Sequence, residues 1–276
     1  ALPIMRAIPR DSFTFERISL PDPFPPGYRE ARVRIIVGDD DIVLALRRLV
    51  GSCPTGDTDD VQARAEAGEA TGTFEAIFDT MVLNAELMPK DHHAGGDLAA
   101  AVARLRDISM GLLMPILASG LMRIPDHYVV DDPDLPGRVA ERGQIDVRSA
   151  GKLVRALRCF WREDFEGAAY IGVTLVEGLL RERLLALGED PYRAPVTGGD
   201  QPGKYATLWT LIDRARKAGL NASWMDFLQY ALCDPSIGPN IRNELLHGAV
   251  MVEPDPGTAS TVLVAALYLA IGIDAS

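Results

Sequence analysis

Three residues near the carboxyl end of the chain carry groups that can act on a phosphodiester. They are Arg242, Asn243 and His247, within the run RNELLHG that spans residues 242–248. An arginine can hold a phosphate through two parallel N–H groups. A histidine can transfer a proton near neutral pH. Together these groups are sufficient for phosphodiester chemistry, and no metal ion is needed.

The reaction that suits these groups is the attack of an RNA 2′-OH on its own 3′-phosphate. In this reaction His247 would act as general acid or base. Arg242 would stabilise the charge that develops on the phosphorane, and Asn243 would orient the histidine or the phosphate. DNA lacks the 2′-OH, so it could not be cleaved in this way.

The spacing of the three residues constrains how they can meet. Asn243 and His247 are four residues apart and share one face of a helix, whereas Arg242 lies about 140° around the helix from His247. Arg242 must therefore reach round on its flexible stem, or face the histidine of a second copy across a two-fold axis. Free N–H groups in the first helical turn would favour an anion beside Arg242. Gly248 would end the helix next to His247.

The same residues also have a purely structural interpretation. An arginine and an asparagine at the start of a helix often only satisfy nearby carbonyl groups. A histidine near the end of a helix is often a capping or packing residue. Three fixed residues within six positions are not specific enough to separate the two interpretations, so both remain open at this stage.

The second half of the chain, residues 149–276, is predicted to be a bundle of five or six helices. Apolar spacing and capping residues predict helices over 149–158, 164–187, 207–218, from Ser223, and from Asn240. Gly188 and Gly219 are suitable residues just beyond helix ends. Asp226, three residues after Ser223, would complete a variant of the capping box. The apolar run 262–273 is too short to span a bilayer and predicts a buried core helix.

The first half, residues 1–148, is predicted to be an α-rich region of unknown role with one or two short strands. Its Pro-rich start, residues 1–30, is expected to be an extended arm. Residues 32–37 alternate and predict a strand, and residues 42–50 predict a short helix. Long helices are expected over 60–88, with Gly68 and Gly72 as points of interruption, and over 97–122, with a kink at Pro115. Residues 124–149 are expected to form a linker, with possible strands at 128–130 and 145–147.

Composition supports a mainly α fold and limits the classes of partner. Hydrophobic residues make up 47% of the chain, which is enough for a core. The content of Ala, Leu and Arg is high and that of aromatic residues only 7%, which favours helices over a β-sandwich. The net charge of −11 argues against a surface that coats nucleic acid broadly, although a local basic cleft is compatible with it. The three cysteines are widely spaced and form no CxxC pair, which is typical of a reducing cytoplasm. We expect no membrane partner.

The segment around Arg242 resembles the HEPN superfamily, whose signature is an arginine, a polar residue and a histidine four to six residues after the arginine. The run 168–187, with Glu177 and Arg181, is similar to the long helix that precedes the motif in one HEPN-like family. The run DPSIGPNIRNELLHG, which includes Asn240, is similar to that family's approach to the motif. The resemblance covers about residues 150–276.

This resemblance implies an antiparallel helical bundle that forms a homodimer. Many HEPN proteins are metal-independent ribonucleases in toxin, phage-defence and RNA-processing systems, and others are non-catalytic binding or scaffold modules. For this chain it implies Arg242, Asn243 and His247 as catalytic residues and Glu177, Arg181 and Asn240 as supporting residues. RNA, a second copy of the chain and a regulatory protein or domain are the expected partners. No cofactor or metal is expected.

Four further groups of residues have types that could bind a ligand. Asp91, His92 and His93 with Asp97 could suggest a metal site, but the glycines that follow favour a loop. The stretch 198–204 is glycine-rich and ends in Lys204, but it lacks the P-loop spacing. The three tryptophans are expected to pack in the core, with base stacking as a minor alternative. A local basic face could come from a set of arginines on the first two bundle helices: Arg155, Arg158, Arg162, Arg181 and Arg183.

Overall fold

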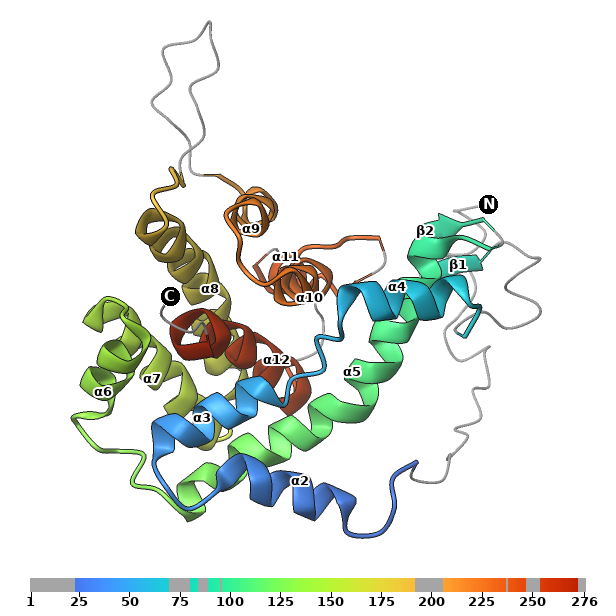
Figure 1. Ribbon diagram of the computed structural model, residues 1–276. Coiled ribbons are helices and arrows are strands. Elements are labelled where there is room, and N and C mark those ends of the chain that lie inside the picture. Colours follow the sequence, from blue (N-terminus) through green and yellow to red (C-terminus); the bar gives the residue numbers. More distant parts are fainter. Residues whose placement is uncertain are drawn as a thin grey trace, which may run out of the picture.

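The computed structural model describes residues 23–69, 80–83, 89–94, 96–191, 206–236, 238–246 and 254–272, and for residues 80–83 and 89–93 it describes the backbone alone. The protein is mainly α-helical, as predicted (Figure 1). The elements of the first half are α2 (Tyr28–Val37), α3 (Ile42–Gly51), α4 (Thr58–Glu66), β1 (Thr80–Leu83), β2 (Pro89–His93), α5 (Leu98–Arg123), η2 (Ile124–Asp126) and α6 (Leu135–Gly143).

The second half carries the helices that were predicted from its apolar spacing. They are α7 (Val147–Trp161), α8 (Phe165–Ala186), α9 (Leu208–Lys217), α10 (Ala222–Leu232), α11 (Ile241–Leu246) and α12 (Pro256–Leu267), which continues as the π-helical turn η3 (Tyr268–Gly272). Asp164 and Thr207 cap α8 and α9 through their side chains. Gly188 and Gly219 follow these helices with φ of 78° and 93°, a conformation that favours glycine.

The strand predicted over residues 32–37 is wrong, because this segment belongs to helix α2. Val33, Ile36 and Val37 have the spacing of one helix face. Ile36 and Val37 are buried, while Ile35 remains 56% exposed. This pattern of burial fits one face of a helix, and it does not fit a strand in which every second residue is buried. The strands suggested at 128–130 and 145–147 are also absent: residues 128–130 are irregular, with a bend at Tyr128 and a turn at Val130, and Val147 begins α7.

The long helix predicted over residues 60–88 agrees with α4 at its start but is wrong at residues 80–83, which form strand β1. α4 ends at Glu66, and Gly68 follows with φ of 80°. β1 and β2 then pair as a short antiparallel ladder, with Thr80 opposite His93. In contrast, α5 matches the helix predicted over 97–122 and begins at Asp97, whose side chain accepts hydrogen bonds from Ala99 N and Ala100 N. Pro115 lies inside this helix.

The residues that were expected to form a linker contribute to the core. They include η2 and α6, and Ile124, Leu135 and Val139 are fully buried. One continuous hydrophobic cluster contains these residues together with apolar residues of α2, α3, α5, α7, α8, α9, α10 and α12. Every residue from Ala259 to Ile271 is buried, and α12 runs through the middle of the other helices (Figure 1). The core thus extends across position 148, the predicted domain boundary.

Close helix contacts and a partly buried arginine join α8 to its neighbours. A Cβ on Gly172 would lie 2.6 Å from Val262 Cγ1, so this glycine lets α8 and α12 approach closely. Arg183 of α8 donates hydrogen bonds to Leu269 O and Ala270 O of η3, at 2.7 and 2.8 Å, and to Gly143 O of α6 at 2.8 Å. Arg183 therefore links three elements through the carbonyl groups at two helix ends.

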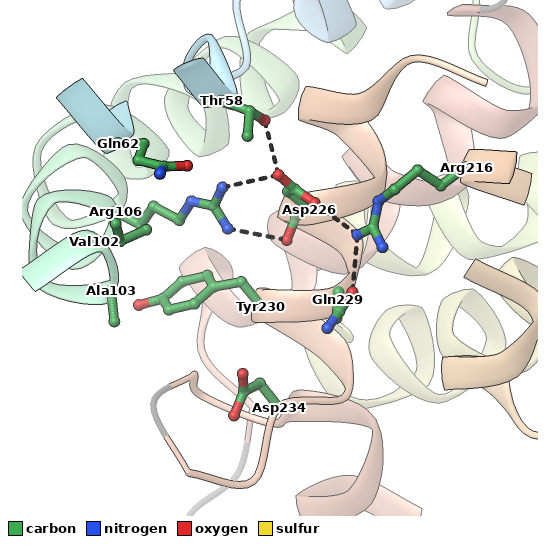
Figure 2. Close-up of a pocket in the computed structure, with 10 residues that line it drawn as sticks. All are labelled: Thr58, Gln62, Val102, Ala103, Arg106, Arg216, Asp226, Gln229, Tyr230 and Asp234. Carbon is green, nitrogen blue, oxygen red and sulfur yellow. Dashed lines mark hydrogen bonds and ion pairs between the residues drawn. The ribbon is translucent and has the colours of Figure 1, made fainter. Parts of the chain in front are cut away.

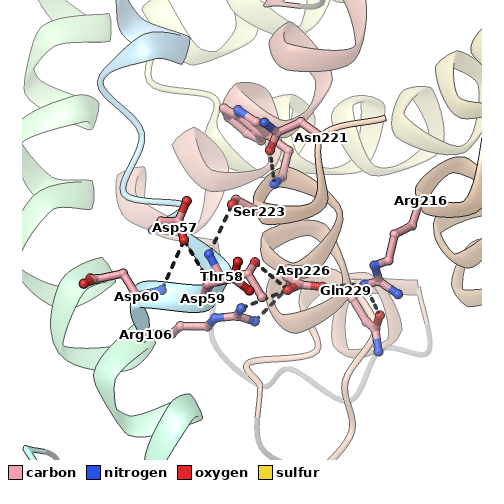
Figure 3. A network of polar contacts seen from close by, with 11 residues as sticks. Asp57, Thr58, Asp59, Asp60, Arg106, Arg216, Asn221, Ser223, Asp226 and Gln229 are labelled. Atoms are coloured by element: carbon pink, nitrogen blue, oxygen red, sulfur yellow. Dashed lines mark hydrogen bonds and ion pairs between the residues drawn. The ribbon is translucent and has the colours of Figure 1, made fainter. Parts of the chain in front are cut away.

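The capping-box prediction for Ser223 and Asp226 is wrong. Asn221 caps α10, and its side chain accepts a hydrogen bond from Trp224 N. Ser223 Oγ instead accepts a hydrogen bond from Thr58 N, at 3.3 Å, and Asp226 bonds to α4, α5 and α9 (Figure 3). The two residues thus join the first half of the chain to the second rather than start a helix.

Two of the three tryptophans pack as expected. Trp161 Nε1 donates to Leu121 O at 2.9 Å, and the ring of Trp224 stacks on Tyr268 with centroids 4.0 Å apart. Trp209 is 45% exposed on α9, so the core-packing prediction does not hold for it.

Candidate functional site

Arg242 lies at the start of α11 and pairs with Glu177 of α8. Its Nε and Nη2 atoms both donate to Glu177 Oε1, at 3.2 and 3.0 Å. Asn240, immediately before α11, has φ of 52°, and its carbonyl accepts the N–H groups of Asn243 and Glu244. The turn at Asn240 thereby directs α11 so that its first arginine reaches α8, although the two residues are distant in sequence.

A chain of hydrogen bonds extends from Arg242 in two directions. Arg242 Nη1 donates to Asn243 Oδ1 at 2.7 Å, and Asn243 Nδ2 donates to Asn240 Oδ1 at 2.8 Å. On the other side, Arg181 Nη2 donates to Glu177 Oε2 at 3.2 Å. Glu177 therefore receives one arginine on each carboxylate oxygen.

The structure brings together five of the six residues predicted for this site. Arg242, Asn243, Glu177, Arg181 and Asn240 form one polar cluster, and the side chain of Arg242 keeps 30% of its surface exposed. His247, the sixth, lies outside the described residues. The described residue nearest to it in sequence is Leu246, and the preceding Leu245 carbonyl accepts the hydroxyl of Tyr170 at 3.1 Å.

Part of the hydrogen-bonding capacity expected for phosphate near the motif is already used within the fold. The N–H groups of Asn243 and Glu244 already donate to Asn240 O, so they are not available to an anion. The predicted basic face is also largely used within the fold. Arg158 donates to Val130 O and Asp132 O, and Arg183 donates to the three carbonyl groups described above. Both guanidinium groups therefore have hydrogen-bond partners within the fold.

Cys233 lies at the end of α10, close to the Arg242 cluster. Burial raises the pKa of its thiol from an ordinary 9.0 to about 12. Burial likewise raises the pKa of the Tyr268 hydroxyl, near Asn221 at the start of α10, from 10.0 to about 12. The folded protein therefore keeps both groups protonated under conditions in which the unfolded chain would release their protons. Cys233 is a neutral, buried thiol and not a nucleophile.

The raised pKa values predict a loss of stability at alkaline pH. Above pH 9 the unfolded chain binds fewer protons than the folded chain, so the free energy of unfolding falls as pH rises, until the folded groups titrate near 12. Each such group contributes a slope of at most about 1.4 kcal/mol per pH unit. Urea unfolding at pH 8, 9, 10 and 11 measures this slope. Cys233→Ala should reduce it, and an unchanged slope would contradict the assignment.

A second polar cluster, which the sequence did not indicate, is centred on Asp226 of α10 (Figures 2 and 3). Asp226 Oδ1 accepts from Arg216 Nη2 at 2.6 Å, and Oδ2 accepts from Thr58 Oγ1 at 2.8 Å and from Arg106 Nη2 at 3.4 Å. The four residues come from α10, α9, α4 and α5. No spacing in the sequence links them, because each lies on a different helix.

Among the residues that the structure describes, no group of three histidine, cysteine or acidic side chains is placed to hold a metal ion. His92 and His93 lie on β2, where only the backbone is described, and the stretch 198–204 lies outside the described residues. Within the same part of the chain one helix, Leu98–Asp126, is long and apolar enough to cross a membrane by length and composition, a test that core helices of soluble proteins also pass.

The chain was compared with protein-family models, with curated proteins and with solved structures, and none of these comparisons found a match.

Proposed function

We propose that this protein is a metal-independent endoribonuclease of the HEPN type, acting in a toxin or phage-defence setting. The observation that carries the proposal is the Arg242 cluster. An arginine, its neighbouring asparagine and a glutamate of the long preceding helix lie together, and the guanidinium remains partly exposed. This is the arrangement that the HEPN resemblance implies for a catalytic arginine and its supporting residues.

In the proposed reaction the RNA 2′-oxygen forms a bond to phosphorus, and the bond from phosphorus to the 5′-oxygen breaks. His247 moves the proton between the 2′-OH and the leaving oxygen. Arg242 stabilises the negative charge on the phosphorane. Glu177 and Arg181 act on this step indirectly, because Glu177 holds Arg242 in place through Oε1. The products would be a 2′,3′-cyclic phosphate and a free 5′-OH.

An alternative function is a non-catalytic module that binds RNA or a nucleotide, or that serves in dimerisation. One observation favours it: two large apolar side chains are exposed beside the motif, Leu246 at 40% and Tyr170 at 38%. Such a surface suits contact with a second copy of the chain. In both proposals the partners are RNA and a second copy in the cytoplasm, with residues 1–148 or a separate protein as regulator.

One experiment separates the two proposals. The purified full-length chain is incubated with a mixed RNA pool in EDTA, beside His247→Ala, and the fragment ends are identified. We expect fragments that end in 2′,3′-cyclic phosphate with the unmodified chain alone. Equal cleavage by His247→Ala would refute the proposed mechanism. Absence of cleavage by a folded, dimeric chain across RNA classes would favour the binding module.

A further inference from the structure

A cavity of about 320 Å³ lies beside Asp226, where α4, α5, α9 and α10 meet (Figure 2). Its size falls within the range of pockets that bind small molecules. Arg106 and Arg216 approach Asp226 from opposite sides, as Figure 2 shows. Both side chains are substantially buried, with 14% and 31% of their surfaces exposed.

The two arginines have hydrogen-bonding capacity beyond their contacts within the described part of the chain. Arg216 donates only through Nη2, to Asp226 Oδ1 and Gln229 Oε1, at 2.6 and 2.8 Å. Its Nη1 and Nε groups have no such contact among these residues. Arg106 donates to Asp226 O and Oδ2 at 3.3 and 3.4 Å, which is longer than an ordinary N–H···O bond. One carboxylate is thus shared by two guanidinium groups.

The remaining walls of the cavity are both apolar and polar. Val102 and Ala103 of α5 supply an apolar side, and the amides of Gln62 and Gln229 supply donors and acceptors. Two further acids are nearby and engaged: Asp234 accepts the Ser236 N–H at 2.9 Å, and Asp107 accepts the Tyr230 hydroxyl. Burial, and then the hydrogen bond to Asp107, raise the pKa of Tyr230, so this phenol adds no charge to the cavity.

We propose that this cavity is a binding site for a small phosphate monoester of mononucleotide size. The phosphate would take the N–H groups of Arg216 and Arg106 that Asp226 leaves available, because a guanidinium matches phosphate with parallel hydrogen bonds. Asp226 would keep both guanidinium groups in position through its hydrogen bonds to them. The body of the ligand would lie against Val102, and its polar edge would face Gln62 and Gln229. This site is separate from the Arg242 cluster, and the proposal does not depend on ribonuclease activity.

The test measures binding of the four nucleoside 5′-monophosphates to the full-length chain by calorimetry, with orthophosphate and adenosine as further probes. We expect saturable binding of a monophosphate and none of adenosine. Arg216→Gln should weaken binding by about tenfold to a hundredfold, since it removes charge-assisted hydrogen bonds. The matched control is Lys217→Gln, which removes the same charge from the next residue of α9, where Lys217 is 74% exposed and pairs with Asp213. This control should bind within about twofold of the unmodified chain.

Two further variants separate loss of binding from misfolding and from binding at the Arg242 cluster. Val102→Trp fills the cavity without removing an ion pair, so it should abolish binding even if Arg216→Gln fails to fold. Arg242→Ala should leave binding unchanged, which separates this site from the proposed ribonuclease site. The inference is overturned if no monophosphate binds saturably, if Lys217→Gln weakens binding as much as Arg216→Gln, or if a folded Val102→Trp binds normally. Tighter binding of orthophosphate than of every nucleotide would also overturn it, since it would show that the rest of the cavity contributes nothing.

Discussion

Replacing Arg242 with alanine should lower the rate of RNA cleavage by about a hundredfold to a thousandfold, the usual cost of removing one transition-state donor. The physical reason is that the guanidinium has N–H groups fixed by Glu177 and Asn243, and no other described arginine shares this arrangement. The protein should remain folded, because Glu177 keeps its pairing with Arg181. The measurement is the single-turnover cleavage rate of a labelled RNA, with circular dichroism as a check of folding.

Three companion variants sharpen this result. Arg155→Ala removes an exposed arginine of α7 and should cleave like the unmodified chain. Arg242→Lys should not restore activity, because lysine is a point charge without two parallel donors. Glu177→Gln keeps an acceptor but removes the charge, so we expect a smaller loss of rate than for Arg242→Ala. Full activity in Arg242→Ala would refute the catalytic assignment, and unfolding of that variant would assign the cluster to stability.

Replacing Arg183 with methionine should lower the free energy of unfolding by about 3 kcal/mol. Methionine fills much of the space, but the carbonyl groups of Gly143, Leu269 and Ala270 lose a charged donor, and each buried acceptor left without a partner costs about 1–3 kcal/mol. Arg183 is partly buried, and this burial lowers the pKa of its guanidinium. Urea unfolding at neutral pH, followed by circular dichroism, measures the change.

The control for this prediction is Arg142→Met on α6. Arg142 precedes Gly143 in sequence and is exposed, so its replacement should change stability by no more than about 0.5 kcal/mol. An equal decrease in the free energy of unfolding in both variants would show that the positive charge stabilises the protein, and not the three hydrogen bonds. An Arg183→Met protein as stable as the unmodified chain would show that water replaces the guanidinium at these carbonyl groups.

The helices of the second half could be predicted because their signals are local. Asp164 and Thr207 provide side-chain caps, Gly188 and Gly219 adopt positive φ, and the apolar residues repeat at helical spacing. The errors arose where local signals were ambiguous. Residues 32–37 alternate over too short a stretch to distinguish a strand from one face of a helix. The apolar residues of 60–88 have helical spacing, yet residues 80–83 form strand β1. This strand depends on antiparallel pairing with β2, which spacing within one segment does not reveal.

The sequence by itself determined the mainly α fold and the caps of α5, α8 and α9, since helix periodicity and capping are properties of neighbouring residues. Spacing alone singled out Arg242, Asn243 and His247, and the HEPN resemblance added Glu177, Arg181 and Asn240. Only the tertiary structure decided which charges meet. Glu177 pairs with Arg242, and Arg183 donates to backbone carbonyl groups of neighbouring helices. Asp226 accepts hydrogen bonds from residues of three other helices. Such pairings depend on how the helices pack, so they leave no pattern along the chain.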